Sequence, residues 1–242
     1  MAVSTSKDDN HQEETYEYDI YQLDEDDIAR YEITNCDKRW HKYKTFKGLL
    51  KNMALFIQGK IPDTPCHLGE LLDNDPEYIS RLLKLNSMNI LTNSGQEYKH
   101  SITKNSIYMQ REYLDFAYKP SKKQDARGVA KQLSDILDAL NKANVYYYAV
   151  SYDDCQVFQS PELGRIDFDN PEFWVTRTLN RYTKEYQNHT HISEPCDIIE
   201  SYIYFNHFAK DIYTGTVFFE VWSKTWDEVD GYLMDEVIKC FS

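Results

Sequence analysis

Apolar positions recur at helical spacing through the first half of the chain. In residues 44–57 the apolar side chains stand at positions 46, 49, 50, 53, 54, 56 and 57, which predicts an amphipathic helix with Thr45 as its N-cap. Residues 75–88 predict a second helix, with Asp75 at the N-cap and Pro76 in the first helical position. Asn89 is expected to end this helix before a short strand at residues 90–92.

The second half of the chain shifts toward runs of aromatic and β-branched residues. Residues 106–117, 145–151 and 215–222 predict strands, whereas residues 122–143 and 226–241 predict amphipathic helices. Residues 155–195 are rich in loop-forming residues and show no clear period. The order strand, helix, strand predicts a right-handed, parallel βαβ unit at about 106–151. We therefore expect an α/β (or α+β) fold, with a helical N-terminal half packed against a mixed sheet in the C-terminal half.

Acidic side chains are concentrated at the beginning of the chain. The 242 residues carry a formal net charge of −13, and residues 1–30 hold ten acids and two bases, a net charge of −8. We expect residues 1–30 to form an acidic, partly disordered leader and residues 31–242 to form a single globular α/β domain. Tyr16, Tyr18 and Ile20 alternate weakly, so part of the leader could also form a short strand or a segment that docks late.

Composition excludes several classes of protein. The chain beyond the leader holds 30 acids and 25 bases, which offers no basic surface to a nucleic acid or to an anionic membrane. The five Cys residues are scattered and odd in number, which argues against a disulfide framework and a zinc cluster. The chain has no signal-peptide pattern and no apolar run of membrane-spanning length, so a cytoplasmic protein is expected. No phosphate-binding or dinucleotide motif is found, and no cofactor is expected.

Turn residues, hydroxyl groups and a histidine concentrate in residues 59–69. Two prolines and Thr64 stiffen the chain before His67, whose imidazole could then act as a general base, orient a substrate, or pin the turn through loop carbonyls. Thr92, Ser94 and Gln96 follow about one helix later and would share one face of an extended strand, either facing a ligand or forming a polar turn. The candidate ligand-binding residues are Thr64, His67, Thr92, Ser94 and Gln96.

Other reactive side chains give weaker patterns. Cys66 and His67 are adjacent and would point in opposite directions in an extended segment, so they cannot easily form a catalytic pair. Asp153 and Asp154, together with acids at 167 and 169, could chelate Mg²⁺, although solvated loop acids are more common in so acidic a chain. The His189-Thr-His191 pair lacks a third ligand, and no metal site is predicted.

Residues 40–120 also match two longer sequence patterns. They match a Gly-x-Ile-Pro-x-Thr-Pro-x-His-x-Gly pattern and, after a helix, a Leu-x-x-Leu-Asn-x-x-Gly-(Ile/Phe)-x-Thr-x-x-Ser-Gln-Pro-Gly pattern, in which Ser94-Gly95-Gln96 replaces the compact Ser-Gln-Pro-Gly. The matching residues are Gly59, Ile61, Pro62, Thr64, Pro65, His67, Gly69, Leu82, Leu85, Asn86, Ile90, Thr92 and Gln96. This part of the chain thus resembles a family of small uncharacterised bacterial and viral proteins, although Asn89 stands where glycine is usual. The family has no known activity, so the resemblance implies an architecture only. A composition rich in Lys, Asn and Tyr is compatible with the AT-rich genome of a large DNA virus.

The sequence favours one class of function and leaves two others open. No complete catalytic set is present, and the acidic leader could engage a basic surface, so we expect a non-enzymatic interaction or regulatory protein with a protein partner. The alternative is a small-ligand binder or a hydrolase-type enzyme that uses the loops around His67 and Gln96. A metal-dependent hydrolase of phosphate esters built on the aspartates is a third possibility.

Overall fold

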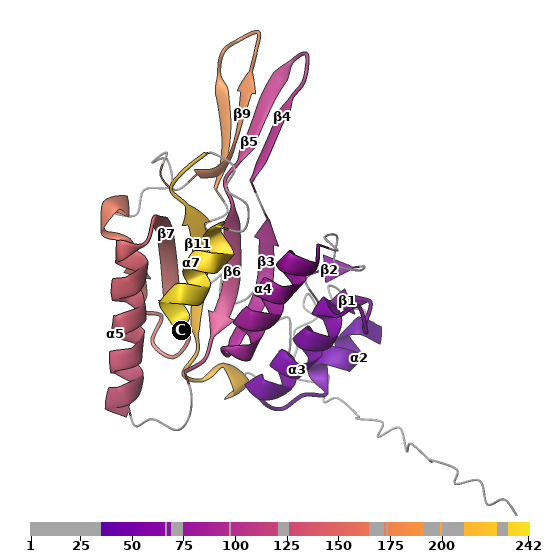
Figure 1. Cartoon of the computed structure of the whole chain (residues 1–242), viewed down its shortest axis with the longest axis vertical. Coiled ribbons are helices and arrows are strands. Elements are labelled where there is room, and N and C mark those ends of the chain that lie inside the picture. Colours follow the sequence, from indigo (N-terminus) through magenta and orange to yellow (C-terminus); the bar gives the residue numbers. More distant parts are fainter. Residues whose placement is uncertain are drawn as a thin grey trace, which may run out of the picture. The chain divides into compact units, whose positions relative to one another are not determined.

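Helices and antiparallel strands alternate along the described part of the chain (Figure 1). The computed structural model describes residues 35–65, 67–68, 75–96, 98–120, 126–164, 172, 174–190, 199, 211–226 and 232–242. All of them belong to one unit, Asn35–Ser242. The predicted acidic leader at residues 1–30 therefore lies outside the described residues.

Three of the five described α-helices lie close to their predicted positions, whereas the first was not predicted and the last is shorter than predicted. The five helices are α2 (Asn35–His41), α3 (Phe46–Ile57), α4 (Pro76–Ser87), α5 (Ala126–Lys142) and α7 (Tyr232–Phe241). Both predicted N-caps are confirmed, because the Thr45 side chain accepts a hydrogen bond from the Gly48 N–H and the Asp75 carboxylate accepts one from Tyr78. Asn89 has a φ of 63°, a left-handed conformation that asparagine tolerates better than most residues and that ends the helical path.

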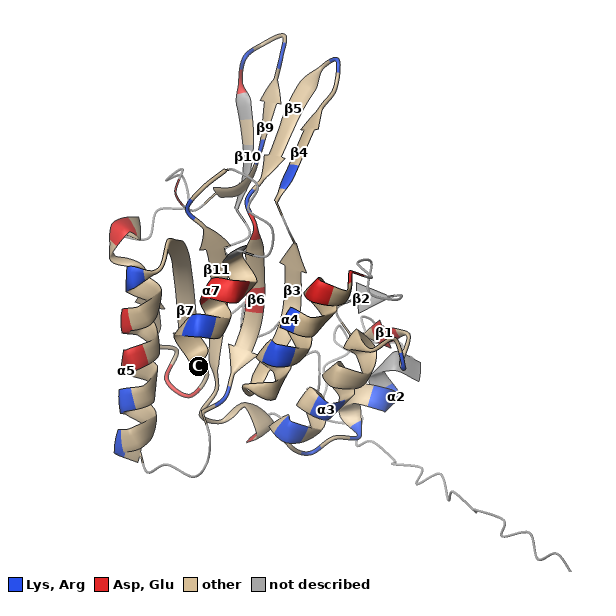
Figure 2. Cartoon of the chain, viewed as in Figure 1, with Lys and Arg blue, Asp and Glu red and all other residues tan. Residues whose placement is uncertain are grey.

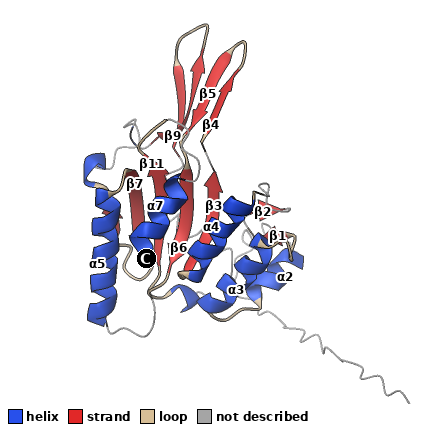
Figure 3. Ribbon diagram, in the orientation of Figure 1, coloured by secondary structure: helices blue, strands red, loops and turns tan. Residues whose placement is uncertain are grey.

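Five strands form the larger sheet, in which every neighbouring pair is antiparallel (Figure 3). Their order is β3 (Ile90–Gln96), β6 (Tyr113–Tyr118), β11 (Val217–Ser223), β7 (Val145–Ser151) and β8 (Val157–Gln159). The strand predicted at 145–151 has the same bounds as β7. The strand predicted at 215–222 corresponds to β11, shifted slightly toward the C-terminus.

Two hairpins form a second sheet of four strands, in the order β10 (Tyr186–Thr190), β9 (Trp174–Asn180), β5 (Ser106–Gln110) and β4 (Lys99–Ile102). The hairpins are β4–β5 and β9–β10, and they lie side by side because β5 pairs with β9. In Figure 1 these strands extend beyond the end of the five-stranded sheet. A two-residue ladder, β1 (Asp63–Thr64) with β2 (His67–Leu68), lies next to α2 and α3.

The predicted βαβ unit at 106–151 is wrong in two respects. Its first strand is really two strands, β5 and β6, which belong to different sheets and are separated at Arg111 and Glu112. In addition, β6 and β7 are not neighbours, because β11 lies between them and pairs antiparallel with both. A strand about 70 residues downstream of β7 fills the gap, and no pattern within 106–151 reveals a partner so distant in sequence.

The expected division into a helical front half and a sheet-like rear half is also wrong. Helices are interspersed with strands throughout the described residues, and both sheets are antiparallel rather than mixed, so the fold is α+β. Residues 155–195, which are rich in loop-forming residues and give no clear prediction, contain β8, β9 and β10. The predicted helix at 226–241 corresponds to the shorter α7, and residues 227–231 lie outside the described part of the chain.

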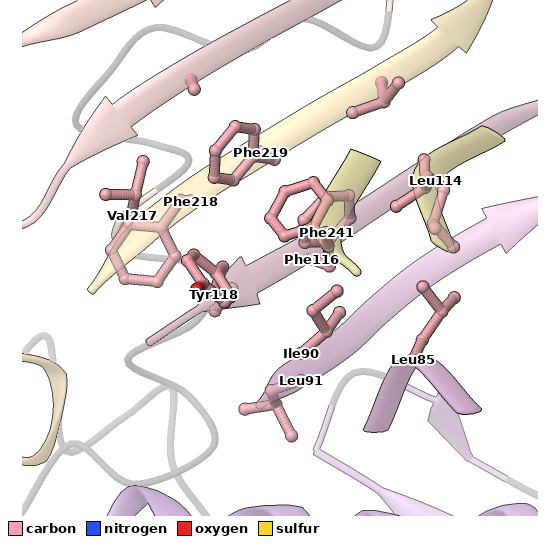
Figure 4. Packing of buried hydrophobic residues seen from close by; sticks show 14 of the residues in the cluster. Leu85, Ile90, Leu91, Leu114, Phe116, Tyr118, Val217, Phe218, Phe219 and Phe241 are labelled. Atoms are coloured by element: carbon pink, nitrogen blue, oxygen red, sulfur yellow. The ribbon is translucent and has the colours of Figure 1, made fainter. Parts of the chain in front are cut away.

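The hydrophobic core lies between the five-stranded sheet and its helices (Figure 4). Phe241 of α7 meets Phe116 and Phe219 edge-on, with ring centroids 5.3 and 5.4 Å apart, while Phe116 and Phe219 stack on one another at 5.1 Å. Each aromatic side chain of this kind removes about 150–250 Å² from water, so this cluster is a large part of the energy that holds α7 to the sheet. Asp115 and Glu220 alternate with these rings along β6 and β11, which places them on the opposite face of the sheet.

Candidate functional site

Thr64 and His67, the first two candidate residues, are paired across the short β1–β2 ladder. Thr64 is buried, and its hydroxyl faces no hydrogen-bond partner among the described residues. The Arg39 guanidinium forms an ion pair with the neighbouring Asp63, and the Trp40 indole N–H donates to the Asp63 carbonyl at 3.2 Å. The rigid turn is therefore fastened to α2, which supports a structural role for this segment.

Thr92, Ser94 and Gln96 lie on β3, but they do not share one face. The register of β3 on β6 shifts between Thr92 and Ser94, so that Thr92 stands opposite Phe116 while Ser94 stands opposite Asp115. A β-bulge of this kind reverses which face the following side chains occupy. The expectation of a single polar face is therefore wrong, and Thr92 points to the helix-covered side with Phe116, apart from Ser94 and Gln96. Thr64 and His67 belong to a different ladder altogether.

A row of polar residues instead crosses the whole five-stranded sheet. Each member stands directly opposite the next on the neighbouring strand, in the order Ser94, Asp115, Glu220, Tyr148 and Gln159. The Ser223 N–H donates to the Glu112 carbonyl, and alternation along the ladder makes Asp115 and Glu220 a pair without mutual backbone hydrogen bonds. Opposed Cα atoms approach to about 4.5 Å at such positions, so two carboxylates are held close together.

The environment of Asp115 changes the pKa of its carboxyl group. Burial raises the pKa of Asp115 to about 7. Glu220 is 8% exposed and Tyr148 is fully buried, whereas Asp115 is half-buried. A second carboxylate on the opposed residue disfavours ionisation of both side chains at once. The pair could donate or accept a proton, or bind a cation.

Arg111 occupies the junction between the two sheets, where β5 ends and β6 begins. Its side chain is only 3% exposed, and its guanidinium lies 4.3 Å from the centre of the Trp226 ring. Arg177 of β9 lies over the same ring at 4.1 Å, and the Glu172 carboxylate is 3.7 Å from Arg111. Burial lowers the pKa of Arg111, and the nearby Glu172 carboxylate opposes this effect. This cluster connects the two sheets, since Arg177 belongs to β9 and the Arg111 guanidinium also lies 5.7 Å from the ring of Tyr146 in β7.

The four-stranded sheet, which we call the arm (residues 98–110 and 174–190), is tied together at its tip. The Arg181 N–H donates to the Asn105 carbonyl at 2.9 Å, and the Arg181 guanidinium donates to the Thr103 carbonyl at 3.1 Å. The Tyr182 hydroxyl adds a bond to the Asn105 side chain at 3.1 Å. The turns of the two hairpins therefore form one surface rather than two separate loops.

This arm is basic, in contrast to the rest of the chain. It contains five basic residues and one acid, listed here in chain order: Lys99, Lys104, Arg177, Arg181, Lys184 and Glu185. Its formal charge is thus +4, which leaves −17 on the remaining residues of a chain whose total is −13. Figure 2 shows Lys and Arg at the tips of both hairpins, and no ion pair joins Lys99, Lys104 or Lys184 to a described acid.

The arm also exposes apolar side chains and a strand edge. Ile102 is 63% exposed and Tyr182 is 68% exposed, and all four residues of β4 are exposed. The Thr103 N–H donates to the Ser106 carbonyl, so Ser101 and Lys99 continue the hydrogen-bonded pairs with β5. The backbone groups of His100 and Ile102 consequently point away from β5, toward the outer edge of the sheet.

The described residues offer no metal centre and no bilayer-spanning element. Among them, no group of three or more His, Cys, Asp or Glu side chains is placed to hold a metal ion, and no helix is long and apolar enough to cross a membrane. The Asp153 carboxylate accepts a hydrogen bond from the Gly215 N–H and Asp154 accepts one from Gln156, as turn-forming acids do. Asp167, Asp169 and His191 lie outside the described residues, and of His189 only the backbone is described.

Comparison with known protein-family models and with curated proteins finds no match to this chain. The resemblance of residues 40–120 to the uncharacterised family consequently stays a prediction. Sequence reasoning missed the arm, because its cations are divided between two segments about 65 residues apart and each segment alone has only two or three. Local net charge, computed for residues 98–110 and 174–190 separately, would have indicated two basic stretches in an acidic chain.

Proposed function

We propose that this protein is a non-enzymatic interaction protein whose arm binds an acidic protein partner. The observation that carries the proposal is the concentration of five cations, an exposed tyrosine and an exposed isoleucine on one rigid four-stranded sheet. A patch of one charge sign on a protein of the opposite net charge steers a complementary partner to that patch. Exposed aromatic and apolar side chains among those cations provide the contact area that a specific complex needs.

Charge reversal with a matched control tests this proposal. The probe is fluorescent poly-L-glutamate in low salt, and the variant is Lys99→Glu, Lys104→Glu and Lys184→Glu together. The control reverses three exposed cations of α5, namely Arg127, Lys131 and Lys142, and changes the net charge equally. Support requires that the arm variant lose roughly tenfold or more in affinity and that the control keep most of it. Equal losses in the two variants, or tighter binding of a single-stranded oligonucleotide than of poly-L-glutamate, would contradict the proposal.

The acidic leader supports a second interaction, with a basic surface of a protein partner. Ten acids in residues 1–30 motivate this proposal, which concerns the leader by itself. Deletion of residues 1–30 should abolish capture by an immobilised basic protein such as lysozyme and leave the melting temperature unchanged. Capture that survives the deletion argues against it.

A small-ligand binder or hydrolase at the loops of His67 and Gln96 has less support. Thr64 is buried beneath the β1–β2 ladder, and the bulge in β3 separates Thr92 from Ser94 and Gln96. The single most relevant measurement is thermal stabilisation by a small-molecule library in the Gln96→Ala and Ser94→Ala variants compared with the original protein. Hits that both substitutions abolish would favour the ligand-binding alternative.

A further inference from the structure

We infer that the outer edge of β4, which pairs with no further strand among the described residues, is a strand-addition site for an extended acidic peptide with alternating acidic and apolar residues. The inference rests on the proposed function, because it assigns a binding mode to the same arm. Its basis is the outward direction of the His100 and Ile102 backbone groups, which leaves two N–H groups and two carbonyls directed to the open edge of the sheet. An added strand satisfies such groups with main-chain hydrogen bonds.

The side chains of β4 define what the added strand must carry. Ile102 and His100 share one face of the strand with Ile107 and Met109 of β5, whereas Lys99 and Ser101 lie on the other face. A peptide on this edge therefore meets an exposed isoleucine on one side and a lysine on the other. Since successive side chains of a strand alternate between faces, the matching peptide has apolar and acidic residues at alternate positions.

Charge distinguishes this occupant from a second copy of the chain. Lys99 and Lys104 flank the edge, and lysines on an edge strand oppose edge-to-edge pairing of identical sheets. An acidic peptide neutralises the same lysines. A nucleic acid could also neutralise them, but it has no peptide backbone to pair with His100 and Ile102 and no aliphatic side chain for Ile102. The observations thus favour a peptide strand.

The test is selection of binders from a random twelve-residue peptide display library on the full-length chain. The expected outcome is enrichment of peptides in which Asp or Glu alternates with β-branched or aromatic residues. Ile102→Pro removes the exposed isoleucine side chain and an N–H that β5 does not use, so it should weaken binding of the selected peptide by roughly tenfold with an unchanged melting temperature. Ile102→Ala keeps that N–H and should weaken binding less.

A scan of single N-methyl groups along the selected peptide tests the geometry without altering the protein. Only alternate amides of an added strand face β4. Methylation of each of these amides should therefore abolish binding, whereas methylation of the amides between them should be tolerated. If the charge reversal of Lys99, Lys104 and Lys184 abolishes binding but Ile102→Pro and the methyl scan have no effect, strand addition is wrong while the proposed function stands. No alternating motif, or a dimer in solution that Ile102→Pro dissociates, also overturns strand addition. Failure of the poly-L-glutamate comparison overturns the proposed function itself.

Discussion

The backbone N–H of Arg181 donates a hydrogen bond to the carbonyl oxygen of Asn105 at 2.9 Å. These two residues lie in the turns of different hairpins, so the bond continues the β5–β9 ladder through to the tip of the arm. Without it, the two turns would be independent loops, and the cations on them would be spread over many arrangements. A single rigid surface instead lowers the conformational entropy that a partner must remove on binding.

A side-chain hydrogen bond between Tyr182 and Asn105 supplements the backbone hydrogen bond between the two turns. Tyr182→Phe and Asn105→Ala each remove the same hydroxyl–amide bond, so each should lower the free energy of unfolding by about 0.5 kcal/mol. The double variant should lose no more than the larger single loss, because both changes delete one interaction. Urea unfolding of the four proteins checks this, and strictly additive losses would show that the two side chains act independently.

Asp115 should make stability depend on pH in a direction opposite to that of an ion-paired aspartate, whose pKa is lowered by folding. Its pKa is raised in the folded protein, to about 7, so the folded state binds a proton that the unfolded state releases near pH 4. Stability is therefore highest at the acidic end of this window and falls as the pH rises from about 4 to about 7. Asp115→Asn, which resembles the protonated form, should raise the melting temperature at pH 8 and flatten the decline.

Glu220→Gln serves as the companion variant for the same measurement. Removal of the opposed carboxylate should also relieve the repulsion, so Asp115 should then ionise at a lower pH. Melting temperatures of the two variants, measured from pH 4 to pH 8, test these pH dependences. If the pH profile of Asp115→Asn matches that of the original protein, the pKa of Asp115 is not raised in the folded state.

Arg111 should be among the least replaceable charged residues of the described part. Arg111→Ala leaves Glu172 without this ion pair and empties the space against Trp226, so a loss of about 3 kcal/mol in the free energy of unfolding is expected. Arg111→Lys keeps the charge but loses the flat surface that stacks on Trp226. Its loss in the free energy of unfolding should therefore be smaller than that of Arg111→Ala but larger than zero. Arg127→Ala on the exposed face of α5 is the control and should cost less than about 0.5 kcal/mol.

Gly95 is a position where backbone and core meet closely. A Cβ added there would lie 2.8 Å from a terminal methyl carbon of Leu114, which is itself buried. Gly95→Ala should therefore lower the free energy of unfolding by about 1–3 kcal/mol through overpacking. Leu114→Val removes the methyl in question, so the additional cost of Gly95→Ala should shrink in that background. An unchanged cost would place the strain elsewhere.

Local patterns in this chain predicted local structure well. The spacing of apolar residues and the caps at Thr45 and Asp75 located α3 and α4, because helix boundaries depend on side chains within a few positions. Strand β7 was located for a similar reason, as a dense run of aromatic and branched residues. Asn89 ended its helix in the left-handed conformation that its residue type allows.

Long-range pairing was beyond the same patterns. The run of apolar residues at 106–117 hides the change of sheet at Arg111, because a buried arginine beside Trp226 has no local signature. The place of β11 between β6 and β7 depends on pairing over about 70 and 100 residues, which local periodicity does not encode. The one-residue bulge before Ser94 likewise reversed the face expected for Thr92. The basic arm emerged only when two distant hairpins came together.

Hydrogen–deuterium exchange of the full-length chain, with and without poly-L-glutamate in low salt, tests the central claim most directly. The account predicts that binding slows exchange within residues 98–110 and 174–190 and leaves α3, α4 and the strands β6, β11 and β7 unchanged. The variant with Lys99, Lys104 and Lys184 reversed should show no such protection, whereas the α5 control should show it fully. Protection confined to the five-stranded sheet or to the helices, with the arm unaffected, would contradict the assignment of the arm as the binding surface.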